Sequence, residues 1–245
     1  MAVGVAIRRS QMGRSLSEWA SEPQMRHQVG SGFWMFLSGA PSLDVNPVLV
    51  HDDDPDALDR VLAAVAELDC PALLWLAGSG RTLAERAGDG WSSVGSTPFM
   101  AIDLQAGQQP RDPRVRRASG ADRAAVDGLV GDAFQLPPEV ATIATAMLSD
   151  PDAALHVWLL EDGDIAGSTV MTCRVDDAVT VWCMATASSA ARRGYGRALL
   201  GEALARAADD GARVGLLAAS DAGKPLYDAT GWQKLEDWDA YTNAT

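Results

Sequence analysis

Three runs of apolar and β-branched residues in the carboxyl-terminal half of the chain predict an antiparallel meander. They cover residues 155–160, 166–174 and 178–185, and short stretches of turn chemistry join them. Before the meander, the pattern predicts a strand over 114–118 and helices over 119–132 and 139–148. Ser119 is the expected cap of the first of these helices.

A helical periodicity follows the meander. Residues 196–210 carry leucines and alanines along one side, and Gly211 provides a stop, so an amphipathic helix is expected. The remaining elements are predicted as a strand over 214–218, a short helix over 224–230 and final strands over 233–242. This alternation of strands and helices indicates an α/β fold.

The clearest break in the pattern is the segment 105–113, which is polar, contains two prolines and lacks periodicity. Such a composition is typical of a linker. A chain of 245 residues is also long for one compact α/β unit and suits two small domains. We therefore predict an amino-terminal domain over 1–104 and a second domain over 114–245.

The two halves resemble each other weakly. Residues 73–83 align without a gap to 216–226 with two leucine pairs, a glycine and a further leucine in common, and Gly90-Trp91 then matches Gly231-Trp232. Each segment follows an alanine-rich amphipathic helix. Chance matching is the alternative, and we prefer a diverged tandem repeat.

Charge and composition narrow the classes of partner. The formal net charge of −13 disfavours a nucleic-acid partner and is compatible with a small cationic acceptor such as an amine. No apolar run approaches the length that crosses a bilayer, and the amino terminus lacks the order of a secretory signal. A cytoplasmic protein without a membrane partner is expected.

The three cysteines, Cys70, Cys173 and Cys183, are widely spaced and form no C-x-x-C pair. We expect them to be reduced and mostly buried, and we expect no metal site. A nucleophilic Cys183 is the sharper alternative, but no histidine lies near it in the sequence to act as a base.

A phosphate-binding turn is predicted where the third run of the meander leads into the amphipathic helix. The segment 191–197 reads Ala-Arg-Arg-Gly-Tyr-Gly-Arg. Converging backbone N–H groups, the positive end of the helix and two glycines together favour an anion. The side chains of Arg192, Arg193 and Arg197 add positive charge. A plain helix start with solvated arginines is the alternative.

Two motifs together resemble the GNAT superfamily of acyl-CoA N-acyltransferases. The turn Arg193-Gly-Tyr-Gly-Arg-Ala-Leu-Leu200 is similar to that family's pyrophosphate loop, and Leu226-Tyr-x-x-x-Gly-Trp232 follows at the family's separation. The resemblance implies a mixed, mostly antiparallel sheet flanked by helices, and, with the repeat, two tandem GNAT-like halves. Ala191 departs from the family's glutamine or arginine, which should weaken coenzyme binding, and Arg192 is placed to compensate.

The resemblance also implies a set of residues that bind acetyl-coenzyme A. Backbone amides of Arg193, Gly194, Tyr195, Gly196 and Arg197 would hold the pyrophosphate. Met184, Ala185 and Thr186 would pair with the pantetheine arm, and an amide near Met184 or Ala185 would stabilise the oxyanion. Ser220 would contact the coenzyme. For Thr186 a core position, and for Ser220 a plain strand-end cap, are the alternatives.

Tyr227 is the catalytic residue that the resemblance implies. A phenol is a suitable proton donor to the thiolate that leaves when an amine attacks the thioester. Packing of the helix against the sheet is its alternative role. No general base is visible, since Thr180 stands where some relatives carry a glutamate, so a water chain or an already neutral amine is expected.

The first half is expected to lack coenzyme binding. Its matching junction, 48–56, has no glycine turn and carries aspartates that repel phosphate, and Ala84 stands in place of Tyr227. His51 is expected to be a solvated loop histidine. The tryptophans of this half (Trp34, Trp75 and Trp91) are expected in the core.

These features predict an N-acetyltransferase that passes the acetyl group from acetyl-CoA directly to a primary amine of a small molecule. Acetylation of protein amino termini or lysines is one alternative. A non-catalytic module that binds acyl-CoA is the other. A homodimer is compatible with the sequence, which does not set the number of subunits.

Overall fold

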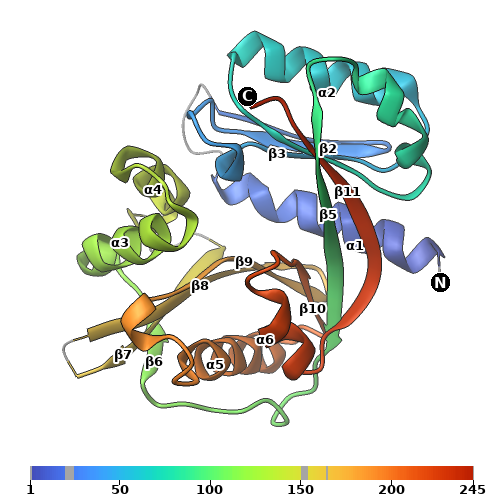
Figure 1. Ribbon diagram of the computed structural model, residues 1–245. Helices are drawn as coiled ribbons and strands as arrows, with labels where there is room; N and C mark the ends of the chain where they lie inside the picture. The colour runs from blue at the N-terminus through green and yellow to red at the C-terminus, as the bar shows by residue number, and fades with distance from the viewer. Residues whose placement is uncertain (1, 20–24, 150–153, 164, 245) are drawn as a thin grey trace. The chain divides into compact units, whose positions relative to one another are not determined.

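The computed structural model describes residues 2–19, 25–149, 154–163 and 165–244 (Figure 1). The contacts divide the chain into two compact units. The first comprises Met1–Phe99, Ala218–Ser220 and Lys234–Thr245, and the second comprises Met100–Leu217 and Asp221–Gln233. The division thus falls ahead of the segment 105–113, and the end of the chain belongs to the first unit.

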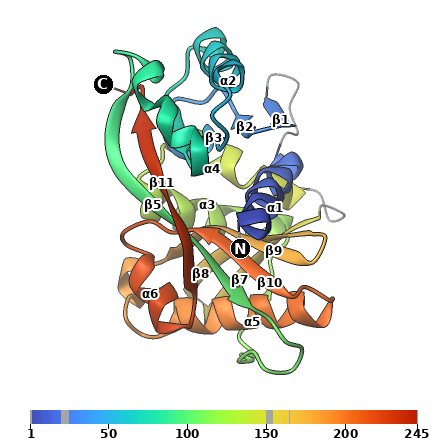
Figure 2. The same cartoon turned by 90° about the vertical axis from the view of Figure 1, so that its right-hand side faces the viewer.

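The first unit is built on a mixed sheet. Its strands are β1 (Arg26–Gly30), β2 (Phe33–Leu37), β3 (Pro47–Val50), β4 (Leu73–Leu76), β11 (Gln233–Thr242) and the first part of β5 (Ser92–Asp103). Strands β1, β2 and β3 pair antiparallel in turn, β4 joins β3 in parallel, and β11 pairs antiparallel with β4. Strand β5 follows β11, and both views show the two side by side (Figures 1 and 2).

Helix α2 (Pro55–Leu68) connects the parallel strands β3 and β4. Its start is encoded locally, because the Asp54 side chain accepts the amide of Asp56 and Pro55 occupies a position that needs no donor. Its apolar side forms the core of this unit together with β2, β3 and β4. A further helix, α1 (Ala2–Arg14), was not foreseen from the sequence.

Tryptophans form a second part of this core. Trp34 and Trp238 are fully buried, and the ring of Trp75 packs against both, with centroid distances of 6.0 and 5.3 Å. Trp91 is partly buried against the core. These side chains are packing residues, as expected.

The second unit contains the predicted meander. Its strands are β6 (Val115–Arg117), β7 (Leu155–Asp162), β8 (Ile165–Val175), β9 (Ala178–Thr186), β10 (Val214–Ala218) and the second part of β5. Its helices are α3 (Arg123–Phe134), α4 (Pro138–Ala144), α5 (Tyr195–Asp209) and α6 (Lys224–Ala229). The strand order is β5-β10-β9-β8-β7-β6, with β10 parallel to β9. Helices α3 and α4 cover one face, and α5 and α6 cover the other (Figure 1).

Two predicted elements differ in detail from the structure. The helix expected over 139–148 is α4 followed by a 3₁₀ turn, Ala146–Ser149, and the hydroxyl of Thr145 at the junction donates a hydrogen bond to Asp127 on α3. The final strands are one strand, β11. Ser119 caps as predicted, through a reciprocal capping box with Asp122 that leads into α3.

The same succession of elements occurs in each half of the sequence. The two successions are β1-β2-β3-α2-β4 and β7-β8-β9-α5-β10. Each consists of a hairpin, a third strand that pairs antiparallel, a helix, and a fourth strand that is parallel to the third. The aligned segments 73–83 and 216–226 begin at β4 and within β10, respectively. The tandem repeat stays a prediction that this succession supports.

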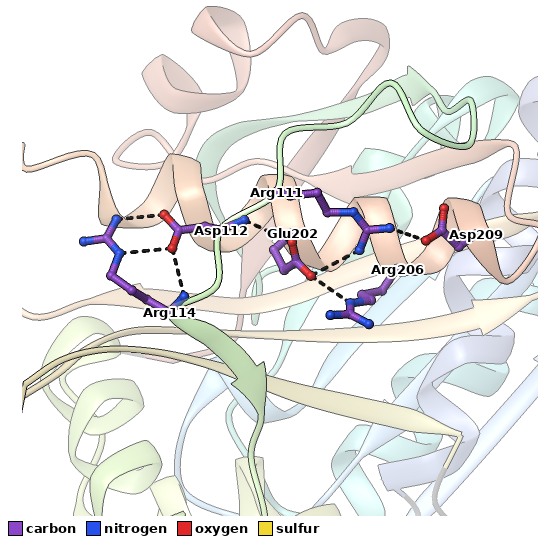
Figure 3. Close-up of polar contacts among 6 residues, drawn as sticks. All are labelled: Arg111, Asp112, Arg114, Glu202, Arg206 and Asp209. Carbon is purple, nitrogen blue, oxygen red and sulfur yellow. Dashed lines mark hydrogen bonds and ion pairs between the residues drawn. The ribbon is translucent and has the colours of Figure 1, made fainter.

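The segment predicted as a linker is fixed to α5 by a buried carboxylate (Figure 3). Glu202 is 2% exposed and accepts hydrogen bonds from Arg111 at 3.1 Å, Arg206 at 2.7 Å and the backbone amide of Asp112 at 3.1 Å. Burial alone would raise the pKa of Glu202, but these donors outweigh it and lower that pKa. The segment is therefore an ordered strap across one helix.

We expect Glu202→Gln to lower the free energy of unfolding by about 1–3 kcal/mol, because two guanidinium groups would then face a neutral amide. Denaturant titration at neutral pH measures this loss. Asp209→Asn, which removes the exposed partner of Arg111 at the end of the same helix, is the matched control and should change stability by less than about 0.5 kcal/mol.

The effect of Glu202→Gln on stability should depend on pH. The folded pKa of Glu202 lies below its unfolded value of about 4.3, so its stabilisation is complete above that pH and is lost as the pH falls through the folded pKa. The gap in stability between Glu202→Gln and the parent should therefore close in acid. A gap that stays constant down to low pH would contradict this role of the charge.

Candidate functional site

The turn between β9 and α5 has the shape that the sequence predicts. A short 3₁₀ turn, Ser188–Ala190, leaves β9, and the chain then reverses through Arg192 with φ of 61° and Gly194 with φ of 82°. Positive φ is readily adopted by glycine, and a side chain at Gly194 would meet nothing within 4 Å. The backbone beside Gly194 is therefore open.

Four of the five predicted amide donors are free at this turn. Within the ranges that the structure describes, the N–H groups of Gly194, Tyr195, Gly196 and Arg197 have no hydrogen-bond acceptor, while the amide of Arg193 donates to Ala190 O at 3.3 Å. The N-cap residue supplies no side chain to satisfy them. Helix α5, with 15 residues, places the positive end of its dipole at the same point.

The three arginines of the turn differ in their surroundings. Arg192 is exposed and pairs with no carboxylate among the described residues. Arg193 lies over the ring of Tyr195 and 3.4 Å from a carboxylate oxygen of Asp162. Arg197 donates to Ala229 O at 2.7 Å, which joins the start of α5 to the end of α6. The positive charge at the turn is therefore only partly neutralised.

Strands β9 and β10 pair over a short stretch and then diverge. Their parallel register runs from Ala178 to Thr180 on β9 and ends there, although β9 continues to Thr186. On its other edge, β9 carries a bulge, because Met171 faces Trp182 and Thr169 faces Ala185. Bulges re-aim backbone groups and are frequent beside active sites.

The bulge holds a strained residue, Cys183, whose φ is 46°. The Cβ atom makes this conformation unfavourable for most residues other than glycine, asparagine and aspartate. The strain lies directly before Met184 and Ala185, the positions predicted to meet the pantetheine arm. Among the described residues, the three cysteines form no disulfide, and Cys70 and Cys173 are buried.

Three elements converge on Gly196. A Cβ at this position would lie 3.1 Å from Met184 Cε, 3.4 Å from Thr186 Oγ1 and 3.5 Å from Leu226 Cδ2. The end of β9, the start of α5 and the helix α6 therefore meet here. The structure brings Met184 and Thr186 together with the turn, and their contact with the coenzyme stays a prediction.

Ser168 on β8 fixes the end of β9 and was not foreseen from the sequence. Its hydroxyl donates to Ala185 O at 2.7 Å and lies 2.8 Å from Thr186 Oγ1. Ser168 is fully buried, so these contacts satisfy a polar group that would otherwise destabilise the strand pair. No sequence motif marks it, since a serine inside a strand gives no signal of its partner.

Tyr227 on α6 reaches the same place. Its hydroxyl lies 3.8 Å from Met184 Sδ, a weak acceptor, and its ring meets Trp232 edge to face with centroids 5.7 Å apart. The side chain is buried, and burial raises the pKa of Tyr227 to about 12. The phenol is thus a protonated donor at neutral pH and lacks a strong acceptor.

Thr180 is occupied by structural contacts. Its hydroxyl donates to Cys173 O at 3.2 Å and accepts from Trp182 Nε1 at 3.1 Å, and the residue is fully buried. Ser220 is exposed and belongs to the first unit, so its predicted coenzyme contact stays a prediction. Within the described residues, no cluster of three or more His, Cys, Asp or Glu side chains could hold a metal ion.

Comparison with known proteins finds one matching family model. Residues 153–234 match the model of the Acetyltransferase (GNAT) domain. No curated protein matches the chain. In the part of the chain that the structure describes, no helix is both long and apolar enough to span a membrane.

Solved structures resemble nearly the whole chain. A GCN5-related N-acetyltransferase from Kribbella flavida is 19% identical, with a TM-score of 0.69 over 97% of this chain and 96% of that one. An acetyltransferase of the GNAT family from Novosphingobium aromaticivorans is 15% identical, with a TM-score of 0.60 over 96% of each chain.

A third structure is a GCN5-related glucosamine N-acetyltransferase region of a fungal multi-domain β-N-acetylglucosaminidase. It is 11% identical, with a TM-score of 0.60 over 93% of this chain and 34% of that one. At these identities the likeness establishes a shared fold, which includes the first unit.

Replacing Tyr227 separates its packing from its hydroxyl. We expect Tyr227→Phe to leave the free energy of unfolding unchanged or raise it by up to about 1 kcal/mol, because the buried hydroxyl has only a weak acceptor. Tyr227→Ala should lower it by about 3–5 kcal/mol through the lost ring. Urea titration measures both, and a large loss for the Phe variant would reveal a strong partner for the hydroxyl.

Proposed function

We propose that this protein acetylates a primary amine of a small molecule with acetyl-CoA as the co-substrate, a function supported by the match of residues 153–234 to the model of the Acetyltransferase (GNAT) domain. The acetyl group passes directly from the thioester to the amine. The observation that carries the proposal is the turn at 194–197, with four backbone donors that no acceptor within the described chain satisfies.

The turn fits the diphosphate of the coenzyme. Four N–H groups point out of a helix start that also carries a positive dipole and exposed guanidinium groups, and these favour two adjacent phosphates. The open backbone at Gly194 lets phosphate oxygens approach closely. We assign the pyrophosphate to the amides of Gly194, Tyr195, Gly196 and Arg197, with Arg192 and Arg193 adding charge.

The diverging strands fit the pantetheine arm. The register of β9 with β10 ends at Thr180 while β9 continues to Thr186, so an extended amide-bearing chain can add to β9 as a strand at Met184–Thr186. We assign this role to Met184, Ala185 and Thr186. Bound acetyl-CoA supplies a thioester carbonyl there, and an amide beside the bulge at Cys183 is the oxyanion donor.

Tyr227 acts as the donor to the leaving sulfur. Its pKa of about 12 keeps the proton on the phenol throughout the physiological range, which excludes it as the base. Its hydroxyl lies beside Met184, the residue assigned to the thioester end of the arm. The weak acceptor that it has in the free protein leaves the proton available for a developing thiolate.

The acceptor must arrive with its amine already neutral or lose a proton to water. The one candidate position for a base on β9, Thr180, is buried and hydrogen-bonded. An amine of low basicity meets this requirement, and amino sugars carry such amines. The structurally similar fungal region acts on glucosamine, which supports an amino sugar as the first acceptor to test.

We expect Tyr227→Phe to lower kcat by about 10²-fold or more, the range of a lost general acid, with an unchanged dissociation constant for acetyl-CoA. Thiol release and calorimetry measure the two quantities. Tyr241→Phe on β11 in the first unit is the control and should match the parent. Unchanged turnover in Tyr227→Phe would remove the acid role.

Gly194→Asp should weaken acetyl-CoA binding by about 10²-fold, because it adds a negative charge beside the diphosphate and strains a residue with φ of 82°. Gly107→Asp is the matched control, since Gly107 has φ of 76° and equally open surroundings in the strap. Equal affinity in both variants would refute the assignment of the turn.

The acceptor class is tested by thiol release over amino sugars, other small amines and peptides. Turnover with small amines supports the proposal. Turnover with peptides alone would indicate a protein acetyltransferase, and acetyl-CoA binding without turnover on any acceptor would indicate a non-catalytic module.

A further inference from the structure

A carboxylate lies beside the turn that is proposed to bind a diphosphate. Asp162 is the last residue of β7, and its Oδ2 accepts a hydrogen bond from the hydroxyl of Tyr195. The guanidinium of Arg193 lies 3.4 Å from the same oxygen. A carboxylate next to an anion site is unfavourable in itself, so its position calls for a compensating role.

Tyr195 is the anchor of the turn. Among residues 191–197, all of which the structure describes, Tyr195 alone is buried, at 4% exposure. It is also the first residue of α5, and its own amide is one of the four free donors. Contacts that fix the side chain of Tyr195 therefore also fix the position of the backbone amides in the turn.

The ring of Tyr195 is fixed on its faces and edge. A Cβ at Gly167 would lie only 2.4 Å from Cδ2 and 2.6 Å from Cε2, so the ring lies directly against the backbone of β8. The guanidinium groups of Arg193 and Arg114 lie 4.8 and 5.4 Å from the ring centroid. These contacts hold the ring, and the hydrogen bond from the hydroxyl to Asp162 also fixes its outer end.

We propose that Asp162 is a positioning residue for the acetyl-CoA site, which holds the pyrophosphate turn in its binding geometry through the hydroxyl of Tyr195. The proposal rests on the function assigned above. Arg193, whose guanidinium lies 3.4 Å from the carboxylate, partly offsets the charge of Asp162, so the carboxylate can lie near a diphosphate without repelling it at full strength. Pre-ordered donors bind more tightly because less freedom is lost on binding.

The test is the affinity for acetyl-CoA in Tyr195→Phe, Asp162→Ala and the double variant, measured by calorimetry on the full chain. Each single variant should weaken binding by about tenfold, and the double variant by no more than either, because both remove one interaction. Asp162→Asn retains an acceptor oxygen and should lose only about threefold. In Asp162→Ala, the loss should appear in the KM for acetyl-CoA, and kcat at saturating acetyl-CoA should stay at the parent value.

Asp209→Asn is the control. Asp209 is the last residue of α5 and pairs with Arg111, so this variant removes a paired carboxylate at the end of the helix opposite the turn. A parent protein that does not bind acetyl-CoA would refute the proposed function itself. Normal binding by the parent with unchanged affinity in the variants would overturn the role of Asp162. A lowered melting temperature without a change in affinity would also overturn it, since it would show a purely structural contact.

Discussion

The unsatisfied amides at the start of α5 are the constraint on which the second unit depends. Every helix begins with donors that have no partner inside it, and most helices supply a side-chain cap. Here Gly194 stands at the cap position and supplies none. The residues around it, with a left-handed Arg192 and Gly194 and a buried Tyr195, keep these donors together and exposed to an incoming anion.

The buried polar groups of the second unit differ in how well they are hydrogen-bonded. Glu202 has donors for both oxygens, and Ser168 satisfies the end of β9, so these groups stabilise the fold. Tyr227 is buried with a sulfur as its acceptor, which contributes little to stability. Its place beside Met184 on β9 agrees with the proposed role as a proton donor.

Much of this unit is predictable from sequence because its signals are local. The meander follows from period-two patterning and turn residues, α5 from its apolar stripe, and the turn from Gly194 and Gly196. Other features depend on pairing between distant segments. Ser168 acts through the register of β8 with β9, and Asp162 through a tyrosine 33 residues later. The hydrogen bond from the Thr145 hydroxyl to Asp127 likewise joins two different helices.

The division into two units also depends on strand pairing between segments that are distant in the sequence. Residues 233–242 read as the end of the carboxyl-terminal half, yet β11 pairs with β4 and lies in the first unit from Lys234 onward. Strand β4 has β3 on its other side, so β11 covers an edge that would otherwise be open. The first half therefore supplies the strand with which the last strand of the chain pairs.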